Sequence, residues 1–236
     1  MTKFIVDSSY WNLFPTSKIG VILIKDYHMD RNLETELKQL LSDSHSLAKK
    51  YLQEKEFSQN RVIQTYRKAY QTFKTKKGAR SSIEALLKRV NSGNEITSIN
   101  PLVDIYNAAS LRFGLPIGAE DSDTFRGDLK LTITNGGDEF YLIGEDFNRP
   151  TLSGELAYVD DVGAVCRCFN WRDGKRTMIT DNTQNAFLVI ELIDNGREII
   201  FKEALDFIAT NTNRFLKAKT QTIILDKEHS EICLLY

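Results

Sequence analysis

The chain has 236 residues, of which 42% are hydrophobic and 27% are charged, enough for one large or two small globular domains and too apolar for a disordered chain. Its 31 basic and 32 acidic side chains leave a net charge of −1. That balance excludes a protein that binds nucleic acid over a uniformly basic surface. No run of 18 apolar residues and no leader pattern occurs, so we expect a cytoplasmic protein without membrane contact.

The first half of the chain has the spacing of two short strands followed by helices. Apolar runs at residues 4–6 and 19–24 flank a turn-rich piece, which predicts two strands, the second of them buried. Apolar residues at helical spacing predict helices over 33–52 and 62–73, and a third over 82–90 that Ser81 or Ser82 caps. A fourth helix is predicted over 102–111.

Past Pro116 the hydrophobic period changes to that of strands. Turn signals separate short β-type runs at residues 129–132, 140–143, 156–159, 163–169 and 186–193. A helix is predicted over 197–215, with late strands over 222–225 and 232–235. The sequence therefore predicts an α+β fold. Residues 1–95 supply a strand pair and basic amphipathic helices packed as part of the fold, and residues 96–236 a mixed or antiparallel sheet with helices.

Positive charge is concentrated in one segment. Residues 61–90 contain nine basic side chains and the single acid Glu84, a net charge of +8 that leaves −9 for the rest. By their spacing, the interleaved Tyr66, Tyr70 and Phe73 belong to the core. The basic side chains fit either contact with a phosphate backbone or simple solubility. The RNA-binding candidates are Arg67, Lys68, Lys74, Lys76, Lys77, Arg80, Lys88 and Arg89.

The sequence has none of the usual motifs of nucleophilic or metal-dependent hydrolysis. G-x-S-x-G, H-E-x-x-H, the Walker loop and G-x-G-x-x-G are all missing, and the three histidines lie far apart. The three cysteines show no C-x-x-C spacing, which fits a reducing compartment. Cys166 and Cys168 are predicted to share one face of a strand. With no matching Cys or His pair, we expect packing roles for both, no metal and no cofactor.

Polar residues gather instead at the ends of predicted segments, and the order of three such stretches is distinctive. They read Asn100-Pro-Leu-Val-Asp-Ile-Tyr-Asn107, then Gly114-Leu-Pro-Ile-Gly-Ala-Glu-Asp-Ser-Asp-Thr-Phe-Arg-Gly127 with Gly154-Glu155, then Ile179-Thr-Asp-Asn-Thr-Gln-Asn185. This order resembles the B3/B4 domain, the editing domain of the phenylalanyl-tRNA synthetase β-subunit. Residues 66–67 and 81–89 look like stand-alone B3/B4 proteins of bacteria, which extends the likeness over almost the whole chain.

The resemblance implies an α+β fold and a pocket that, in the synthetase, hydrolyses mischarged tyrosyl-tRNA by positioning water and substrate. Nothing resembles the synthetase's other β-subunit domains or the catalytic motifs of its α-subunit, so we expect no aminoacylation. The family pattern has His where this chain has Gly118, and it places Arg172 near the Glu that reads the tyrosine hydroxyl. A cation there argues against tyrosine as the substrate and favours an anionic or carbonyl-bearing ligand.

The resemblance also supplies the candidates for a substrate pocket, without assigning a catalytic residue. Trp171 is expected either as a pocket wall or as a core residue at a strand end. Thr180 and Thr183 match the family's pocket edge, where they either bond a substrate or end a strand. The pocket candidates are Arg172, Trp171, Asn170, Thr180, Thr183, Glu155, Asp121 and Gly118.

Two hypotheses of function follow. The leading one is a tRNA- or RNA-binding protein on the editing-domain fold, acting as a free-standing deacylase for a mischarged tRNA. The alternative is a non-catalytic module that keeps the pocket for a small amino-acid-like ligand or a partner.

Overall fold

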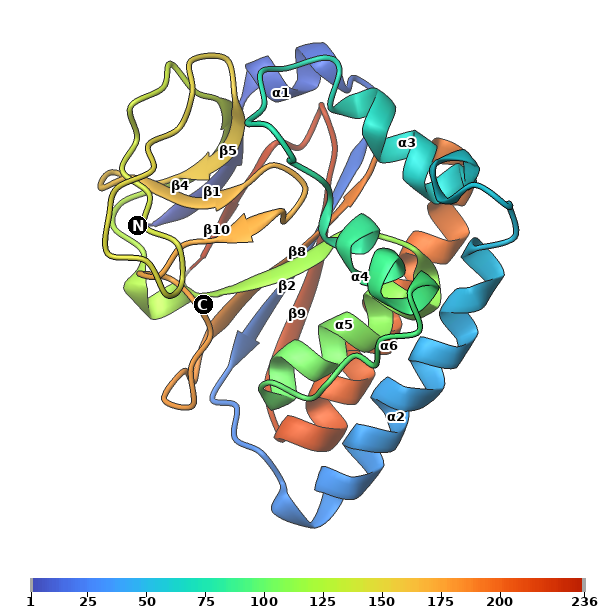
Figure 1. Ribbon diagram of the computed structural model, residues 1–236. Helices are drawn as coiled ribbons and strands as arrows, with labels where there is room; N and C mark the ends of the chain where they lie inside the picture. The colour runs from blue at the N-terminus through green and yellow to red at the C-terminus, as the bar shows by residue number, and fades with distance from the viewer. Residues whose placement is uncertain (1, 235–236) are drawn as a thin grey trace.

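Two sheets and a layer of helices build the structure, a computed structural model that describes residues 2–234 (Figure 1). Within these residues the larger sheet has the strand order β10-β1-β4-β5-β6-β7 and the smaller has the order β3-β8-β2-β9. The larger sheet contains β1 (Lys3–Val6), β4 (Leu129–Ile133), β5 (Leu156–Val159), β6 (Ala164–Arg167), β7 (Arg172–Asp173) and β10 (Glu231–Cys233). The smaller contains β2 (Lys18–Lys25), β3 (Ile117–Asp121), β8 (Ala186–Leu192) and β9 (Lys219–Leu225). The architecture is α+β, as predicted.

Strands from both parts of the chain pair in each sheet. β1 is parallel to β4 and antiparallel to β10, while β2 is antiparallel to both β8 and β9. β2 therefore lies in the middle of the smaller sheet. Val21 and Leu23 belong to the core between the sheets, whereas Ile22 and Ile24 belong to the core beneath the helices. Because both faces are covered, residues 19–24 have no exposed polar face, and the prediction of a buried strand is confirmed.

Helices cover the outer face of the smaller sheet. α5 (Pro101–Phe113) packs between α2 (Glu34–Leu47) and α6 (Glu198–Leu216), and α5 and α6 contact the strands (Figure 1). The other α-helices are α1 (Ser8–Leu13), α3 (Arg61–Ala69) and α4 (Ser82–Asn91). Short 3-10 turns lie at Arg31–Leu33, Ala48–Tyr51, Phe57–Gln59, Ser122–Thr124 and Asn195–Arg197. The described residues include no helix that is long and apolar enough to cross a membrane.

Local signals explain where the predicted helices begin and end. The Ser81 hydroxyl accepts a hydrogen bond from the Glu84 amide and caps α4, as predicted. Asn100 caps α5 in the same way, by accepting from the Leu102 amide. α5 ends at Gly114, whose φ of 62° suits glycine. The helices predicted over 33–52, 62–73, 82–90, 102–111 and 197–215 all form, with bounds that differ by a few residues.

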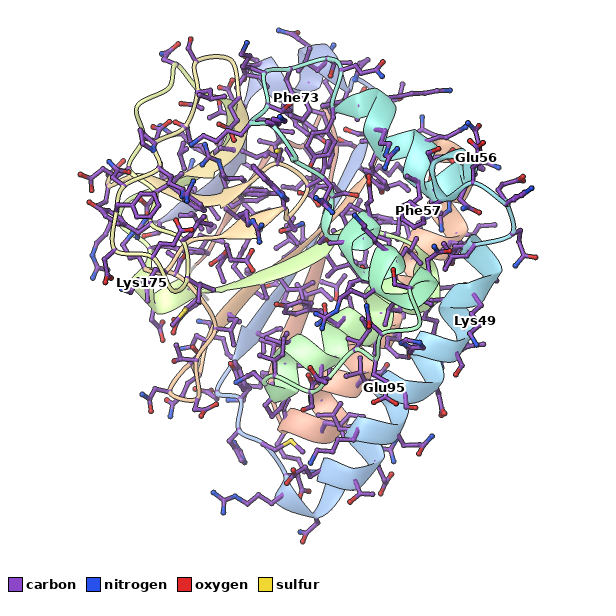
Figure 2. All side chains as sticks on the ribbon, viewed as in Figure 1. Lys49, Glu56, Phe57, Phe73, Glu95 and Lys175 are labelled. Carbon is purple, nitrogen blue, oxygen red and sulfur yellow. The ribbon has the colours of Figure 1, made fainter. Side chains whose placement is uncertain are left out.

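Of the aromatic residues of the basic segment, Tyr66 is buried in the core as predicted, whereas Tyr70 and Phe73 are partly buried and pack against it. Tyr66, Tyr70 and Phe73 surround the ring of Phe169, with centroids 5.4 to 6.0 Å away, and Phe14 completes the group. We call these five residues the aromatic cluster. Phe73 lies on the segment that joins α3 to α4, whereas Lys49 and Glu56 project from the outer, helical side (Figure 2). The basic segment is therefore anchored through its rings, which leaves its charged groups at the surface.

One predicted strand is absent, and one prediction about a strand face is wrong. Residues 140–143 form only the isolated bridge of Leu142 with Gly174. Their backbone is held by loop contacts instead, such as the hydrogen bond that the Phe140 amide donates to Asn148 Oδ1 at 3.0 Å. The strand expected at 163–169 ends at Arg167, so Cys168 lies in the turn beyond it and does not share a strand face with Cys166. The strand predicted over 232–235 does form, as Glu231–Cys233, and residue 235 lies outside the described residues.

Besides β7 and the short 3-10 turns, α1 and β3 were not predicted. α1 has only six residues, too few for a hydrophobic period, and Asp7 caps it by accepting from the Ser9 amide. β3 contains glycine and two acids, residues that are depleted in strands. It forms because seven-residue β8 offers it a complete antiparallel partner, from Ile117 opposite Ile190 to Asp121 opposite Ala186.

Candidate functional site

A tight turn joins β6 to β7 and positions several of the predicted pocket residues. The Trp171 amide donates to the Cys168 carbonyl at 3.0 Å, and the two central residues, Phe169 and Asn170, have φ values of 48° and 54°. Two positive φ values define a type I′ turn, which suits Asn and strains Phe. Burial of the Phe169 ring in the aromatic cluster stabilises that strained conformation.

The pairing register of this hairpin sorts its side chains by charge. Cys166 pairs with Asp173, and Arg167 pairs with Arg172. Paired residues of an antiparallel ladder project to the same face, and neighbours along a strand project to opposite faces. Cys166 and Asp173 therefore share one face, and the two arginines share the other.

The arginine face opens on a pocket of about 260 Å³, which we call the cationic pocket. It is lined by Lys76, Lys77, Leu142, Glu145, Arg149, Arg167, Trp171 and Arg172. The Lys76 ammonium donates to the Arg149 carbonyl at 3.2 Å. Burial, and next the charge of Arg167, lower the pKa of Lys76. Residues from two predicted sets line this one pocket. Lys76 and Lys77 are RNA-binding candidates, and Trp171 and Arg172 are substrate-pocket candidates.

Trp171 combines the two roles that the sequence left open. It is partly buried and packs against the core between the sheets, and it also forms part of the pocket lining. The Arg172 guanidinium lies 5.7 Å from the centre of its ring. Arg172 itself is exposed. An exposed guanidinium beside an indole face can bind an anion together with a stacked ring.

The opposite face of the hairpin meets a group of buried acids between the sheets. This acidic cluster consists of Glu120, Cys166, Asp173 and Glu191. The Tyr158 hydroxyl and the Asn170 amide donate to the Glu191 carboxyl at 2.8 and 2.7 Å. The Cys166 thiol contacts Asp173 Oδ1 at 3.5 Å. Glu120 and Glu191 are 5% and 1% exposed, so the cluster is held away from solvent except at the half-buried Asp173.

Burial raises the pKa of every acid in this cluster, because the charged forms lose their hydration. It raises the pKa of Asp173 to about 6 and the pKa of Glu191 to about 8. Burial, and next the charge of Asp173, raise the pKa of Glu120 and of the Cys166 thiol well above their usual values. The thiol is therefore not a ready nucleophile.

Gly118 lies next to this cluster, and its lack of a side chain has a direct steric reason. A Cβ atom at this position would lie 2.3 Å from Asn170 Oδ1. Asn170 is 7% exposed and holds its place through its bond to Glu191. The space that a side chain at residue 118 would need is thus occupied by Asn170.

Glu155 forms a buried ion pair rather than part of an open site. Its carboxylate accepts from Arg167 Nε at 2.6 Å and Nη2 at 2.7 Å, and the two side chains are 0% and 2% exposed. Arg167 also donates to the carbonyls of Arg149 and Pro150, and its guanidinium lies 5.0 Å from the Phe140 ring. This pair closes the floor of the cationic pocket.

Asp121, Thr180 and Thr183 come together in a separate network. The Thr183 hydroxyl donates to Asp121 Oδ2 at 2.7 Å, and the Thr180 amide donates to the Thr183 hydroxyl at 3.0 Å. Asp121 also accepts from the Asp123 amide at 3.1 Å. The network ties the end of β3 to the segment before β8, and none of its members lines the cationic pocket.

The other basic candidates are distributed over α3, α4 and the segment between them. Arg67 pairs with Glu84 at 2.7 Å. With Arg80 and Lys88 it borders a second pocket of about 450 Å³. Lys68, Lys74 and Arg89 are exposed. Basic side chains therefore extend from α4, along the segment that joins α3 to α4, to the cationic pocket.

Sequence reasoning missed Glu120, Asp173 and Glu191 as members of one site. Glu191 did carry a signal, since it interrupts the apolar run of residues 186–192 and a buried acid needs a partner. Asp173 gave none, because aspartate is common in turns. The meeting of β3 with the β6–β7 hairpin depends on sheet packing that has no local signature.

Together these features define an α+β protein whose two stacked sheets enclose polar groups beneath a cationic pocket. The B3/4 domain profile matches residues 65–225. Two phenylalanine--tRNA ligase β subunits are similar over shorter stretches, from Psychrobacter arcticus (34% identity over 100 residues) and Xanthomonas euvesicatoria (29% over 93). The matches cover 42% and 39% of this chain and 12% of each relative.

A solved structure is similar at the level of the chain trace. It is an N-terminal fragment of the phenylalanyl-tRNA synthetase β-subunit from Pyrococcus horikoshii, with 12% identity and a TM-score of 0.48 over 95% of this chain and 54% of that one. The profile match covers well over half of the chain. The chain belongs to the B3/4 domain family.

Proposed function

We propose that this protein binds tRNA through the cationic pocket and the adjoining basic surface, and that it hydrolyses the ester of a mischarged aminoacyl-tRNA. The observation that carries the proposal is the arrangement of opposite charges on the two faces of one hairpin. One face of the hairpin borders the cationic pocket, which Trp171 lines, and the other face borders the buried titratable groups of the acidic cluster. The relatives named above are β subunits of a tRNA ligase, which favours tRNA among possible RNA partners.

The chemistry of the pocket fits a phosphate group beside a base. Lys77 and Arg172 are exposed, and neither forms a salt bridge among residues 2–234. Free cations at a pocket mouth release bound counterions when they meet phosphates, which makes binding dependent on salt. Trp171 offers a face on which a nucleobase or a planar group can stack.

The proposed reaction is hydrolysis by water without a protein nucleophile. Water adds to the ester carbonyl carbon, the bond to the ribose oxygen breaks, and that oxygen leaves with a proton as the tRNA hydroxyl. The raised pKa of Cys166 argues against a thiolate attack. Hydrogen-bonding groups that orient water and ester can supply much of such a rate enhancement.

The binding half is tested by measuring tRNA affinity as a function of salt. The variant Lys77→Ala with Arg172→Ala should bind at least tenfold more weakly. Its plot of log affinity against log salt should lose about two units of slope, one for each phosphate contact. Lys227→Ala, an exposed lysine at the turn after β9, is the matched control and should bind like the parent. Equal salt slopes in all three proteins would refute this role of the pocket.

The hydrolytic half is tested separately with a panel of misacylated tRNAs. The protein should release the amino acid from at least one of them, and the Lys77 and Arg172 variant should release it more slowly. Binding of tRNA without release from any member of the panel would contradict the deacylase. One observation favours that outcome, because Asn170 fills the space beside Gly118. The function would then be the alternative, a non-catalytic module that recognises tRNA or a small amino-acid-like ligand.

A further inference from the structure

We propose that Glu120, Cys166 and Asp173 form a binding site for a divalent metal ion of the zinc class. One ligand atom from each of these side chains lies within 4.8 Å of the other two. Cys166 and Asp173 come from the paired strands of one hairpin, β6 and β7, and Glu120 comes from β3, more than 40 residues earlier in the chain and in the other sheet. This metal site is independent of the proposed reaction with tRNA. It gives Cys166 the role of a metal ligand, in place of the packing role expected from the sequence.

The state of Glu120 is the independent observation that points to a missing ligand. The side chain is 5% exposed, and neither of its carboxyl oxygens has a partner at hydrogen-bond distance and angle among the described residues. The nearby Thr177 hydroxyl lowers the pKa of Glu120, but at 3.5 Å it donates to the Val165 carbonyl. A buried carboxyl group without partners destabilises the fold, because its lost hydration is not replaced. One of these oxygens lies within 4.8 Å of the Cys166 sulfur and of a carboxyl oxygen of Asp173, so a second acid adjoins it. A cation bound among the three groups would satisfy all of them.

The cations of the protein do not fill this role. Arg176, whose charge lowers the pKa of Glu120, is paired with Asp160 at 2.8 and 2.9 Å. Arg172 acts on Asp173 but projects to the other face of the hairpin. The cluster is thus enclosed by protein yet lacks a bound positive charge in the described part of the chain.

The spacing suits a small ion. A tetrahedral zinc ion with oxygen ligands at about 2.0 Å and sulfur at about 2.3 Å requires its ligand atoms to be roughly 3.3 to 3.5 Å apart. Separations of up to 4.8 Å must therefore shorten by up to about 1.5 Å, a change that rotation of two side chains can share. Asp173 is half-buried and gives the ion a path from solvent. Three protein ligands leave a fourth position for water.

The ligand types favour zinc over magnesium or calcium. Thiolate sulfur is a soft ligand that selects zinc and related ions, whereas magnesium and calcium require sets of oxygen ligands. Binding displaces the protons of the Cys166 thiol and of the Glu120 carboxyl, which leave to solvent, and the groups then coordinate as thiolate and carboxylate.

The test is a titration of the reduced protein with Co²⁺, followed by Zn²⁺, in a Cys233→Ser background. That substitution removes the exposed cysteine as a competing thiol. We expect one equivalent of Co²⁺ to produce a sulfur-to-cobalt charge-transfer band in the near ultraviolet, and Zn²⁺ to abolish it. Cys166→Ser should eliminate the band. Cys168→Ser, the neighbouring buried cysteine, is the matched control and should keep it.

A second variant keeps the proposal testable if Cys166→Ser fails to fold. Glu120→Gln removes an unpartnered carboxyl, so the metal-free variant should melt at or above the temperature of the parent, yet bind Co²⁺ at least tenfold more weakly. The rise in melting temperature that Zn²⁺ gives the parent should be lost. The proposal is overturned if no thiolate band forms at one equivalent, if the band survives Cys166→Ser, or if Glu120→Gln binds as tightly as the parent. None of these readouts involves tRNA, so they are independent of the proposed function.

Discussion

Glu191 gives the sharpest prediction for the stability of the fold. Its carboxyl is buried between the sheets, where the Tyr158 hydroxyl and the Asn170 amide donate to it. Burial outweighs these bonds and raises its pKa from 4.5 to about 8. In the unfolded chain the group ionises near its usual pKa. Between these two values the folded protein holds a proton that the unfolded chain releases.

The sign of the effect follows from this difference. Glu191 contributes most to the free energy of unfolding below pH 4.5. This contribution is lost as the pH rises toward 8, because ionisation of its carboxyl favours the unfolded chain. One pKa unit corresponds to about 1.4 kcal/mol. From pH 5.5 to pH 7.5 the group should therefore lower the free energy of unfolding by roughly 2 to 3 kcal/mol.

Glu191→Gln keeps the shape of the side chain and removes the titration. We expect the stability of this variant relative to the parent to increase by roughly 2 to 3 kcal/mol between pH 5.5 and pH 7.5. Urea unfolding followed by circular dichroism at both pH values measures it. Glu203→Gln, an exposed glutamate on α6, is the control and should follow the parent. If Glu191→Gln also follows the parent at both pH values, the buried proton on Glu191 is refuted.

Three further substitutions test other parts of the structure by urea unfolding. Arg167→Ala should cost about 3 to 5 kcal/mol because it leaves the Glu155 carboxylate buried and unpaired, and a loss below 1 kcal/mol would contradict the buried pair. Gly118→Ala should cost about 1 to 3 kcal/mol through its clash with Asn170; adding Asn170→Gly should cost less than the sum of the single changes, and strict additivity would argue against the contact. Ser81→Ala should cost about 1 kcal/mol by removing the cap of α4, which an unchanged urea midpoint would disprove.

The sequence predicted most of the fold because most elements carry a local signal. α4 has a capping serine and an apolar stripe, and β2 is apolar throughout because it lies at the centre of a covered sheet. β3 was missed since it owes its conformation to its partner strand β8 and not to its own residues. Residues 140–143 show the converse error, as an apolar run held in place by loop contacts.

The candidate site could be predicted only in pieces. The resemblance brought Asn170, Trp171 and Arg172 into one list, and all three belong to the same hairpin. It did not indicate that Asn170 and Arg172 face opposite ways, because that depends on the positions of the turn and of the strand ends. The partner acids Glu120 and Glu191 lie on the other sheet, a relation between distant residues that no single pattern in the sequence contains.

The separation of charge on this hairpin depends on its register, and the register depends on the turn. Shifting the pairing by one residue would turn Arg167 toward the acids between the sheets and Cys166 toward the cationic pocket. The turn that prevents this contains Phe169 in a conformation that costs a bulky residue about 1 kcal/mol or more. Tyr66 and Tyr70 of the basic segment hold that ring. The aromatic residues between the lysines and arginines are thus part of the site without facing it, since they fix the turn that keeps the cations and the acids on opposite faces.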